Sequence, residues 1–112
     1  MFGLKNEDIK TVKKILAKYR QVASGFIFGS RAKGNFKPGS DVDIALKGVR
    51  IDQKVITKIS SELNEKTTMP YHFDVLNYKA IQNGDLISHI DRVGKKFNKK
   101  TTALRKIKSP NI

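Results

Sequence analysis

The sequence predicts an α/β (α+β) fold, in which helices pack against a small mixed β-sheet. Segments 6–19 and 52–63 have apolar residues at helical spacing, while 22–28, 42–46 and 71–76 are short apolar runs typical of buried strands. Helical and strand-like segments alternate along the chain. We therefore expect one sheet with helices packed against it.

The first helix is expected to start at Asn6, a residue type favoured at helix N-caps. Its apolar face is expected to contain Ile9, Val12, Ile15, Leu16 and Tyr19. A short buried strand follows over residues 22–28, and the dipeptide Gly29-Ser30 ends it.

The middle of the chain predicts a short helix, a loop, a strand and a long helix. The short helix covers residues 30–33 and stops at Gly34, and the strand covers 42–46. Asp52 is placed to cap the long helix. The apolar face of this helix is formed by Val55, Ile56, Ile59 and Leu63.

The last third of the chain predicts a strand, a helix and a short edge strand. Met69-Pro70 interrupts the chain before the strand at 71–76, and apolar spacing predicts a helix from about 79 to 93. Residues 95–98 are expected to add a short edge strand.

Length and charge divide the chain unevenly. With 112 residues it has the size of one domain, which we expect at residues 1–97, followed by a basic tail at 98–112. Residues 1–91 hold fifteen Lys and Arg and all ten acids, whereas residues 92–112 hold eight Lys and Arg and no acid. A basic tail suits a polyanion or an acidic protein, and it also suits a solvated chain end.

Composition excludes several classes of protein. The absence of cysteine excludes disulfide frameworks and zinc sites built on thiolates, and it fits a cytoplasmic protein. No apolar run approaches the roughly 20 residues of a membrane span, and the charged first residues show no secretory signal. We therefore expect no association with a membrane.

Three carboxylates are the most informative side chains. Asp41 and Asp43 alternate along a predicted strand, so they share one face and lie roughly 7 Å apart along it. Asp74, on the strand at 71–76, joins them if the two strands are neighbours. Such a group repels itself unless protons or cations are bound, and carboxylates are preferred ligands of Mg²⁺. Asp-x-Asp alone is common by chance; its combination with Gly29-Ser30 and a later strand-borne acid favours a metal site for one or two ions.

The turn at Gly29-Ser30 is the expected phosphate site. Glycine allows close backbone approach, and amides at the start of a short helix point toward an anion. Arg31 is expected to neutralise phosphate or pyrophosphate. Ser40, grouped with these phosphate-binding residues, is also placed to steady the backbone of Asp41.

The two histidines are expected to have minor roles. His72, beside a strand carboxylate, has acid–base chemistry, but packing or hydrogen bonding is the simpler interpretation. His89 lies on the last predicted helix and is expected at the surface. The aromatic residues Tyr71, Phe73 and Tyr78 are expected in the core.

The pattern from Gly29-Ser30 through Asp41-Val42-Asp43, with Asp74 further on, resembles the DNA-polymerase-β-type nucleotidyltransferase superfamily. The longer run Gly-Ser-Arg-Ala-Lys-Gly and the short chain look most like its minimal nucleotidyltransferase (MNT) group. The resemblance covers roughly residues 8–97 and implies a polymerase-β-like palm. It is more specific for the superfamily than for a substrate.

The resemblance implies a reaction and a site. ATP or another nucleotide would bind with Mg²⁺, of which two ions are expected, and an acceptor hydroxyl would attack the α-phosphorus as pyrophosphate leaves. Asp41 and Asp43 would hold the metals, and Asp74 would either bind metal or act as base. Gly29 and Ser30 would hold the β- and γ-phosphates.

The MNT resemblance also implies a partner, a small helical HEPN protein. In that arrangement the MNT protein acts as antitoxin by adding AMP to a tyrosine hydroxyl of the HEPN toxin. One alternative is the nucleotide-binding subunit of a small-molecule nucleotidyltransferase, for example one acting on an aminoglycoside. Another is a non-catalytic nucleic-acid-binding module that uses the basic tail, with affinity falling steeply with salt.

Overall fold

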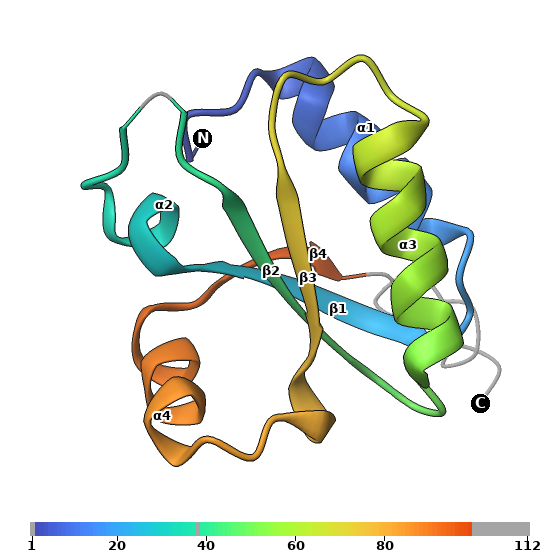
Figure 1. The fold of residues 1–112 in the computed structure, drawn as a ribbon, viewed down its shortest axis with the longest axis vertical. Helices are drawn as coiled ribbons and strands as arrows, with labels where there is room; N and C mark the ends of the chain where they lie inside the picture. Colours follow the sequence, from blue (N-terminus) through green and yellow to red (C-terminus); the bar gives the residue numbers. More distant parts are fainter. Residues whose placement is uncertain (1, 38, 100–112) are drawn as a thin grey trace, which may run out of the picture.

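The computed structural model describes residues 2–37 and 39–99 and contains one four-stranded sheet with helices against it (Figure 1). Along the chain the elements are α1 (Asn6–Ala17), β1 (Val22–Phe28), α2 (Gly29–Lys33), β2 (Val42–Gly48), α3 (Gln53–Glu65), β3 (Phe73–Asn77), a 3₁₀ turn (Tyr78–Ala80), α4 (Gly84–Val93) and β4 (Lys95–Lys99). The α/β class predicted from the sequence is therefore confirmed. None of the described helices has the length and hydropathy needed to cross a bilayer.

The sheet is mixed, with the strand order β3-β2-β1-β4. β1 pairs antiparallel with both β2 and β4, and β2 pairs parallel with β3. The long connection through α3 allows β2 and β3 to run parallel, since parallel neighbours need a crossover. β4 forms one edge, as the sequence predicted.

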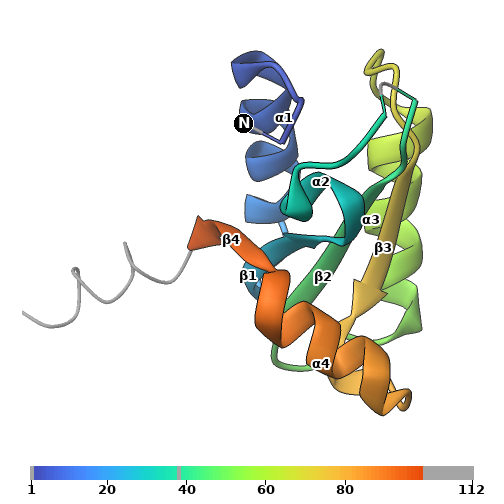
Figure 2. The same cartoon turned by 90° about the vertical axis from the view of Figure 1, so that its left-hand side faces the viewer.

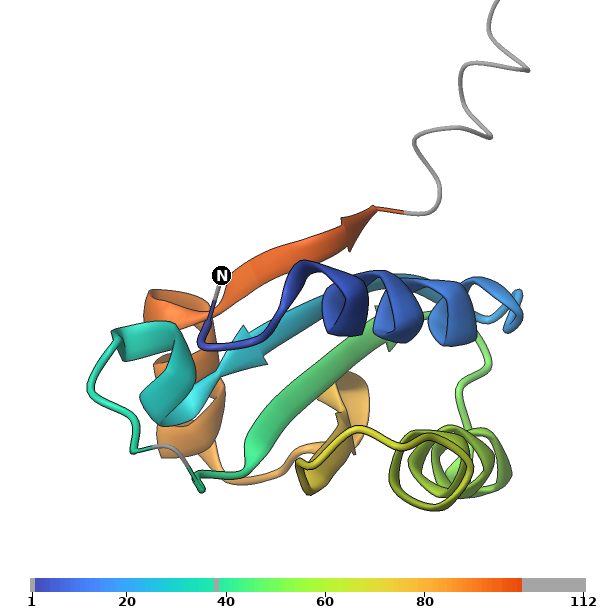
Figure 3. The ribbon, with the colours of Figure 1, turned by 90° about the horizontal axis from the view of Figure 1, so that it is seen from above.

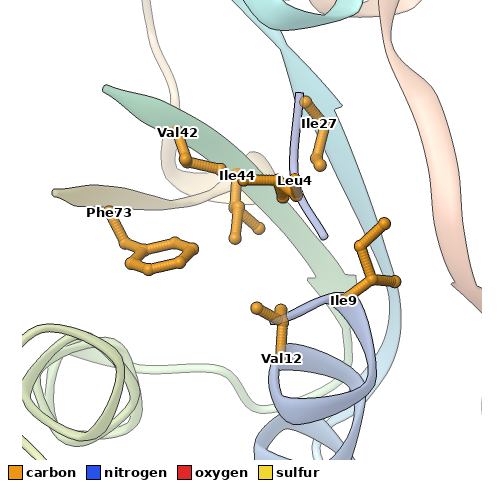
Figure 4. Close-up of a pocket in the computed structure, with 7 residues that line it drawn as sticks. All are labelled: Leu4, Ile9, Val12, Ile27, Val42, Ile44 and Phe73. Carbon is orange, nitrogen blue, oxygen red and sulfur yellow. The ribbon is translucent and has the colours of Figure 1, made fainter. Parts of the chain in front are cut away.

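One face of the sheet is covered by α1 and α3. Apolar side chains at helical spacing turn inward from both helices, so each helix buries one stripe. Seven side chains from the N-terminal segment, α1 and the strands β1, β2 and β3 converge here, and Figure 4 shows them facing one another: Leu4, Ile9, Val12, Ile27, Val42, Ile44 and Phe73. The space between them leaves no room for a water molecule, so this is core and not a ligand site.

The opposite face carries α2 and α4, which Figure 2 brings to the front. Because strand side chains alternate, Phe28 and Ala45 point away from the first core and pack with Ile90 of α4 in a second, smaller cluster. This cluster holds α4 across the face of the sheet that also bears Asp43. Tyr78 and Leu86 pack against its margin.

Some boundaries differ from the sequence prediction. Lys5, not Asn6, is the N-cap of α1, and Asn6 is already helical. β3 begins at Phe73 rather than at residue 71, and the side chain of Asn64 accepts a hydrogen bond from the amide of Phe73 and donates one to its carbonyl. β2 extends to Gly48, two residues beyond the predicted end.

The largest difference is the start of α4, at Gly84 and not near residue 79. Two asparagines break the predicted helix into separate pieces. Asn77 accepts a hydrogen bond from the Lys79 amide and caps the 3₁₀ turn, and Asn83 accepts from the amides of Asp85 and Leu86 and caps α4. β4 runs to Lys99, past the predicted domain boundary at 97, and residues 100–112 of the predicted tail lie outside the described residues.

Candidate active site

The β1–α2 turn has a geometry that glycine alone suits. Gly29 has φ of 72°, in the left-handed region, and a Cβ atom there would lie 2.5 Å from Oδ2 of Asp43. Gly34 ends α2 with φ of 87° and donates its amide to the Ser30 carbonyl at 2.9 Å. The backbone of the predicted phosphate turn therefore lies directly against a predicted metal ligand.

The sheet brings two of the three acids together. Asp43 of β2 and Asp74 of β3 are partners in the parallel register, so their Cα atoms are one strand spacing, about 4.8 Å, apart. Asp41 precedes the first residue of β2 and is exposed. The neighbouring strands that the sequence analysis required are thus present, and all three acids lie at one end of β2.

The electrostatics of this end follow from its like charges. Burial raises the pKa of Asp43 above its usual value of 3.8, and the nearby carboxylates of Asp74 and Asp41 raise it further. The positive charge of Arg31 acts in the opposite direction. The cluster therefore carries more negative charge than its protein neighbours compensate.

A divalent cation fits this chemistry. The donors are carboxylate oxygens, which Mg²⁺ prefers, and a cation would relieve the repulsion that raises the pKa of Asp43. Within residues 2–37 and 39–99, however, no three His, Cys, Asp or Glu side chains already stand in a metal-holding arrangement. Asp41, Asp43 and Asp74 would have to adjust their side chains to share an ion.

Arg31 has buried backbone contacts that the sequence analysis did not predict. Its side chain is 3% exposed, and it donates from Nη1 to the Phe2 carbonyl at 2.9 Å and from Nη2 and Nε to the Ser40 carbonyl at 2.8 and 3.2 Å. The guanidinium also lies over the rings of Phe36 and Tyr71. The structure therefore shows a buried group that joins segments of the protein, and the expected role of Arg31 toward phosphate stays a prediction.

Ser40 closes the loop before Asp41. Its hydroxyl accepts from the Lys37 amide at 3.0 Å, and its own amide donates to the Lys37 carbonyl at 2.9 Å. These two hydrogen bonds steady the turn that leads into Asp41.

His89 is a site residue that the sequence analysis assigned wrongly to the surface. It is half-buried, and its Nε2 accepts a hydrogen bond from the Gly29 amide at 3.2 Å, while its ring meets Phe28 edge-on at 6.1 Å. The two residues are 60 positions apart, so only the docking of α4 brings them together. His72 is exposed, and its backbone carbonyl accepts from the Val42 amide.

The comparison with protein families gives one match. The family model described as "Polymerase beta, Nucleotidyltransferase" matches residues 10–102, which is most of the chain. The matched range contains every acid and glycine of the candidate site. No curated protein sequence matches the chain.

Solved structures show the same fold at low identity. One described as a toxin–antitoxin with AMP-PNP is 18% identical, with a TM-score of 0.66, and the match covers 84% of this chain and 73% of that one. A second, described as a tri-AMPylated Shewanella oneidensis HEPN toxin in complex with MNT antitoxin, is 16% identical with a TM-score of 0.64 and covers 84% and 71%. A third, a putative nucleotidyltransferase from Sulfolobus solfataricus, is 22% identical with a TM-score of 0.51 and covers 82% and 77%.

Proposed function

The chain belongs to the polymerase β nucleotidyltransferase family, and from this premise we propose that it transfers AMP from ATP to a hydroxyl of a partner protein. The observation that supports this most is the pairing of Asp43 with Asp74 across β2 and β3, with Gly29 packed against Asp43. This arrangement brings the turn at Gly29 and Ser30 and adjacent carboxylates to one end of the sheet, which supports the proposal.

Each residue of the site has a role in this proposal. Asp41 and Asp43 would hold Mg²⁺, which would supply charge stabilisation at the entering and leaving oxygens, and Asp74 would either complete the metal site or act as base. The turn at Gly29 and Ser30 would bind the β- and γ-phosphates through the Ser30 hydroxyl and the backbone amides after Gly29, because the Gly29 amide itself donates to His89. His89 holds the Gly29 amide and so fixes one peptide plane of this turn.

The proposed transfer is a single displacement at the α-phosphorus of ATP. The acceptor oxygen forms a bond to the α-phosphorus, the bond from that phosphorus to the bridging oxygen breaks, and pyrophosphate leaves with the electron pair. The acceptor proton passes to a carboxylate, and Asp74 is the candidate because its exposed position on the edge strand allows an acceptor to approach. Positioning and electrostatics would supply most of the rate.

The proposed acceptor is a tyrosine of a small helical HEPN-type toxin, so that the chain acts as an antitoxin in the cytoplasm. Two structures with the same fold are described as toxin–antitoxin complexes, one with AMP-PNP and one with an AMPylated HEPN toxin and an MNT antitoxin. In this proposal the partner would also supply walls for the acceptor site.

The test has two stages. First, calorimetry measures binding of a non-hydrolysable ATP analogue with Mg²⁺ to wild type, to Asp43→Asn and to Asp85→Asn, an exposed control acid in α4. Second, the protein is incubated with ATP and a co-expressed HEPN protein, and the partner's tyrosines are examined by mass spectrometry. Binding lost only in Asp43→Asn, with AMP on a tyrosine, supports the proposal; binding of nucleotide by neither wild type nor variant contradicts it.

A further inference from the structure

Asp41 differs from the other two acids in how its backbone is held. Asp43 and Asp74 lie inside strands, where ladder hydrogen bonds and the β2–β3 register determine their positions. Asp41 lies before β2, whose first residue Val42 bonds the His72 carbonyl. Its position therefore depends on the loop that follows α2.

Arg31 holds the end of that loop. Two of its nitrogens donate to the Ser40 carbonyl, which belongs to the peptide group shared by Ser40 and Asp41. A fork of two donors on one oxygen limits both the position and the tilt of that peptide plane. Since the plane leads directly into Asp41, it determines where the Asp41 side chain starts.

The guanidinium is itself held from three other sides. Nη1 donates to the Phe2 carbonyl of the N-terminal segment, and the rings of Phe36 and Tyr71 lie 4.9 and 5.4 Å from the guanidinium carbon. Figure 3 shows the N-terminal segment beside the α2 region. A Cβ atom on Gly3 would lie 2.8 Å from Nη1, which shows how closely the chain wraps this group.

We infer that Arg31 is a positioning residue, which places Asp41 for metal binding through the Ser40 carbonyl and does not contact the nucleotide. The inference rests on the proposed function, because it assumes that Asp41 is a metal ligand. Among the described residues no carboxylate forms an ion pair with Arg31. Its N–H groups donate to the backbone carbonyls of Phe2 and Ser40, and its charge acts on Asp43 without direct contact.

Replacement of Arg31 by lysine tests the geometry of its hydrogen bonds separately from its positive charge. Arg31→Lys keeps the positive charge but cannot place two donors on the Ser40 oxygen or stack a planar group between the rings. Arg20→Lys makes the same chemical change at an exposed position between α1 and β1 and serves as the matched control. Binding of Mn²⁺ alone, followed by electron paramagnetic resonance, and binding of ATP in EDTA are measured for each, without any need for turnover.

The expected result is a loss of Mn²⁺ affinity of about tenfold or more in Arg31→Lys, as for other residues that orient metal ligands, with metal-free ATP binding and Arg20→Lys unchanged. Weakened ATP binding in EDTA with normal Mn²⁺ affinity would overturn the inference in favour of a direct phosphate contact. Unchanged values in both assays would also overturn it and leave Arg31 a packing residue. Wild type that binds no Mn²⁺ would instead overturn the proposed function, and the inference with it.

A second variant reaches the same peptide group without altering Arg31. Ser40→Ala removes the hydroxyl that accepts from the Lys37 amide and so loosens the turn that presents the Ser40 carbonyl. If Arg31→Lys fails to fold, Ser40→Ala is expected to weaken Mn²⁺ binding severalfold while circular dichroism stays unchanged. Normal Mn²⁺ affinity in this folded variant would contradict the inference.

Discussion

At the scale of single residues, Gly29 is where the backbone and the acids constrain each other most tightly. Gly29→Ala would force an L side chain into φ of 72° and place its Cβ 2.5 Å from Oδ2 of Asp43. Gly34→Ala would meet the same kind of backbone strain at φ of 87°, but with no atom within 4 Å. Each is expected to lower the free energy of unfolding by about 1–3 kcal/mol.

The two glycine variants should differ in function. Only Gly29→Ala displaces Asp43, so only this variant is expected to lose Mn²⁺ and nucleotide binding while it remains folded. Urea denaturation and calorimetry measure the two effects separately. Equal binding losses in both variants would mean that strain in α2, and not the contact with Asp43, disturbs the site.

The charge of Asp43 gives a prediction with a defined pH dependence. Its pKa is raised in the folded protein by burial and by Asp74 and Asp41. The Asp43 carboxyl therefore ionises more readily in the unfolded chain than in the folded protein. The stability that protonated Asp43 contributes is present below its usual pKa of 3.8 and is lost as pH rises through the folded pKa. At pH 7, metal-free Asp43→Asn is therefore expected to be more stable than wild type.

The measurement is urea denaturation in EDTA at pH 7 and at a pH near 3.8, the usual pKa of the carboxyl. The stability that Asp43→Asn gains over wild type at pH 7 should shrink at the lower pH. Added Mg²⁺ should stabilise wild type by binding and leave Asp43→Asn unaffected. Asp85→Asn, outside the cluster, serves as the control and should show no gain in EDTA at pH 7. A variant less stable than wild type at pH 7 would show that packing and hydrogen bonding of Asp43, and not its charge, dominate.

At the scale of elements, α4 is coupled to the turn at Gly29 and Ser30 through His89. His89→Phe keeps a ring beside Phe28 but removes the acceptor for the Gly29 amide, whereas His89→Gln retains an acceptor. A hydrogen bond of this kind contributes about 1 kcal/mol, so His89→Phe is expected to bind the ATP analogue several times more weakly. His72→Phe, at an exposed histidine, is the control. Tighter binding by His89→Phe would mean that His89 competes with phosphate for the amide.

Elements with a local signal were predicted well from the sequence. The glycine that ends α2, the Asp52 cap of α3 and the alternation that puts Asp43 on the face away from Ile44 depend on neighbours within a few residues. Asp52 accepts from the Val55 amide at 3.0 Å, as a cap should. Such features require no knowledge of the rest of the fold.

Features that depend on distant segments could not be predicted in the same way. The start of α4 was misplaced because Ile81 continues the apolar spacing, although Asn83 caps the helix two residues later. The roles of His89 and Arg31 are determined by the docking of α4 and by the N-terminal segment, which sequence periodicity does not report. The predicted metal ligands, phosphate-binding residues and domain boundary stay predictions. The structure nevertheless brings the predicted metal-binding acids close to the turn at Gly29 and Ser30.

At the scale of the whole molecule, acids and bases are unevenly distributed. The three site acids lie at one end of β2, while the formal net charge of the chain is +13. An anionic nucleotide would be attracted over a distance by this excess, an effect that salt weakens. The same excess would bind nucleic acid without specificity, so the two kinds of binding must be separated.

Deletion of residues 103–112 separates them. The deletion removes Arg105, Lys106 and Lys108 but leaves the range of the family match, residues 10–102, intact. Mg²⁺-dependent binding of the ATP analogue is expected to stay within about twofold of wild type, because the site acids and the turn lie in or beside β1, α2, β2 and β3. Binding of a short DNA duplex at low salt is expected to weaken and to depend less steeply on salt, because the shortened chain neutralises fewer phosphates. If the deletion abolished nucleotide binding while Asp43→Asn left it intact, the basic tail and not the carboxylate cluster would be the nucleotide site.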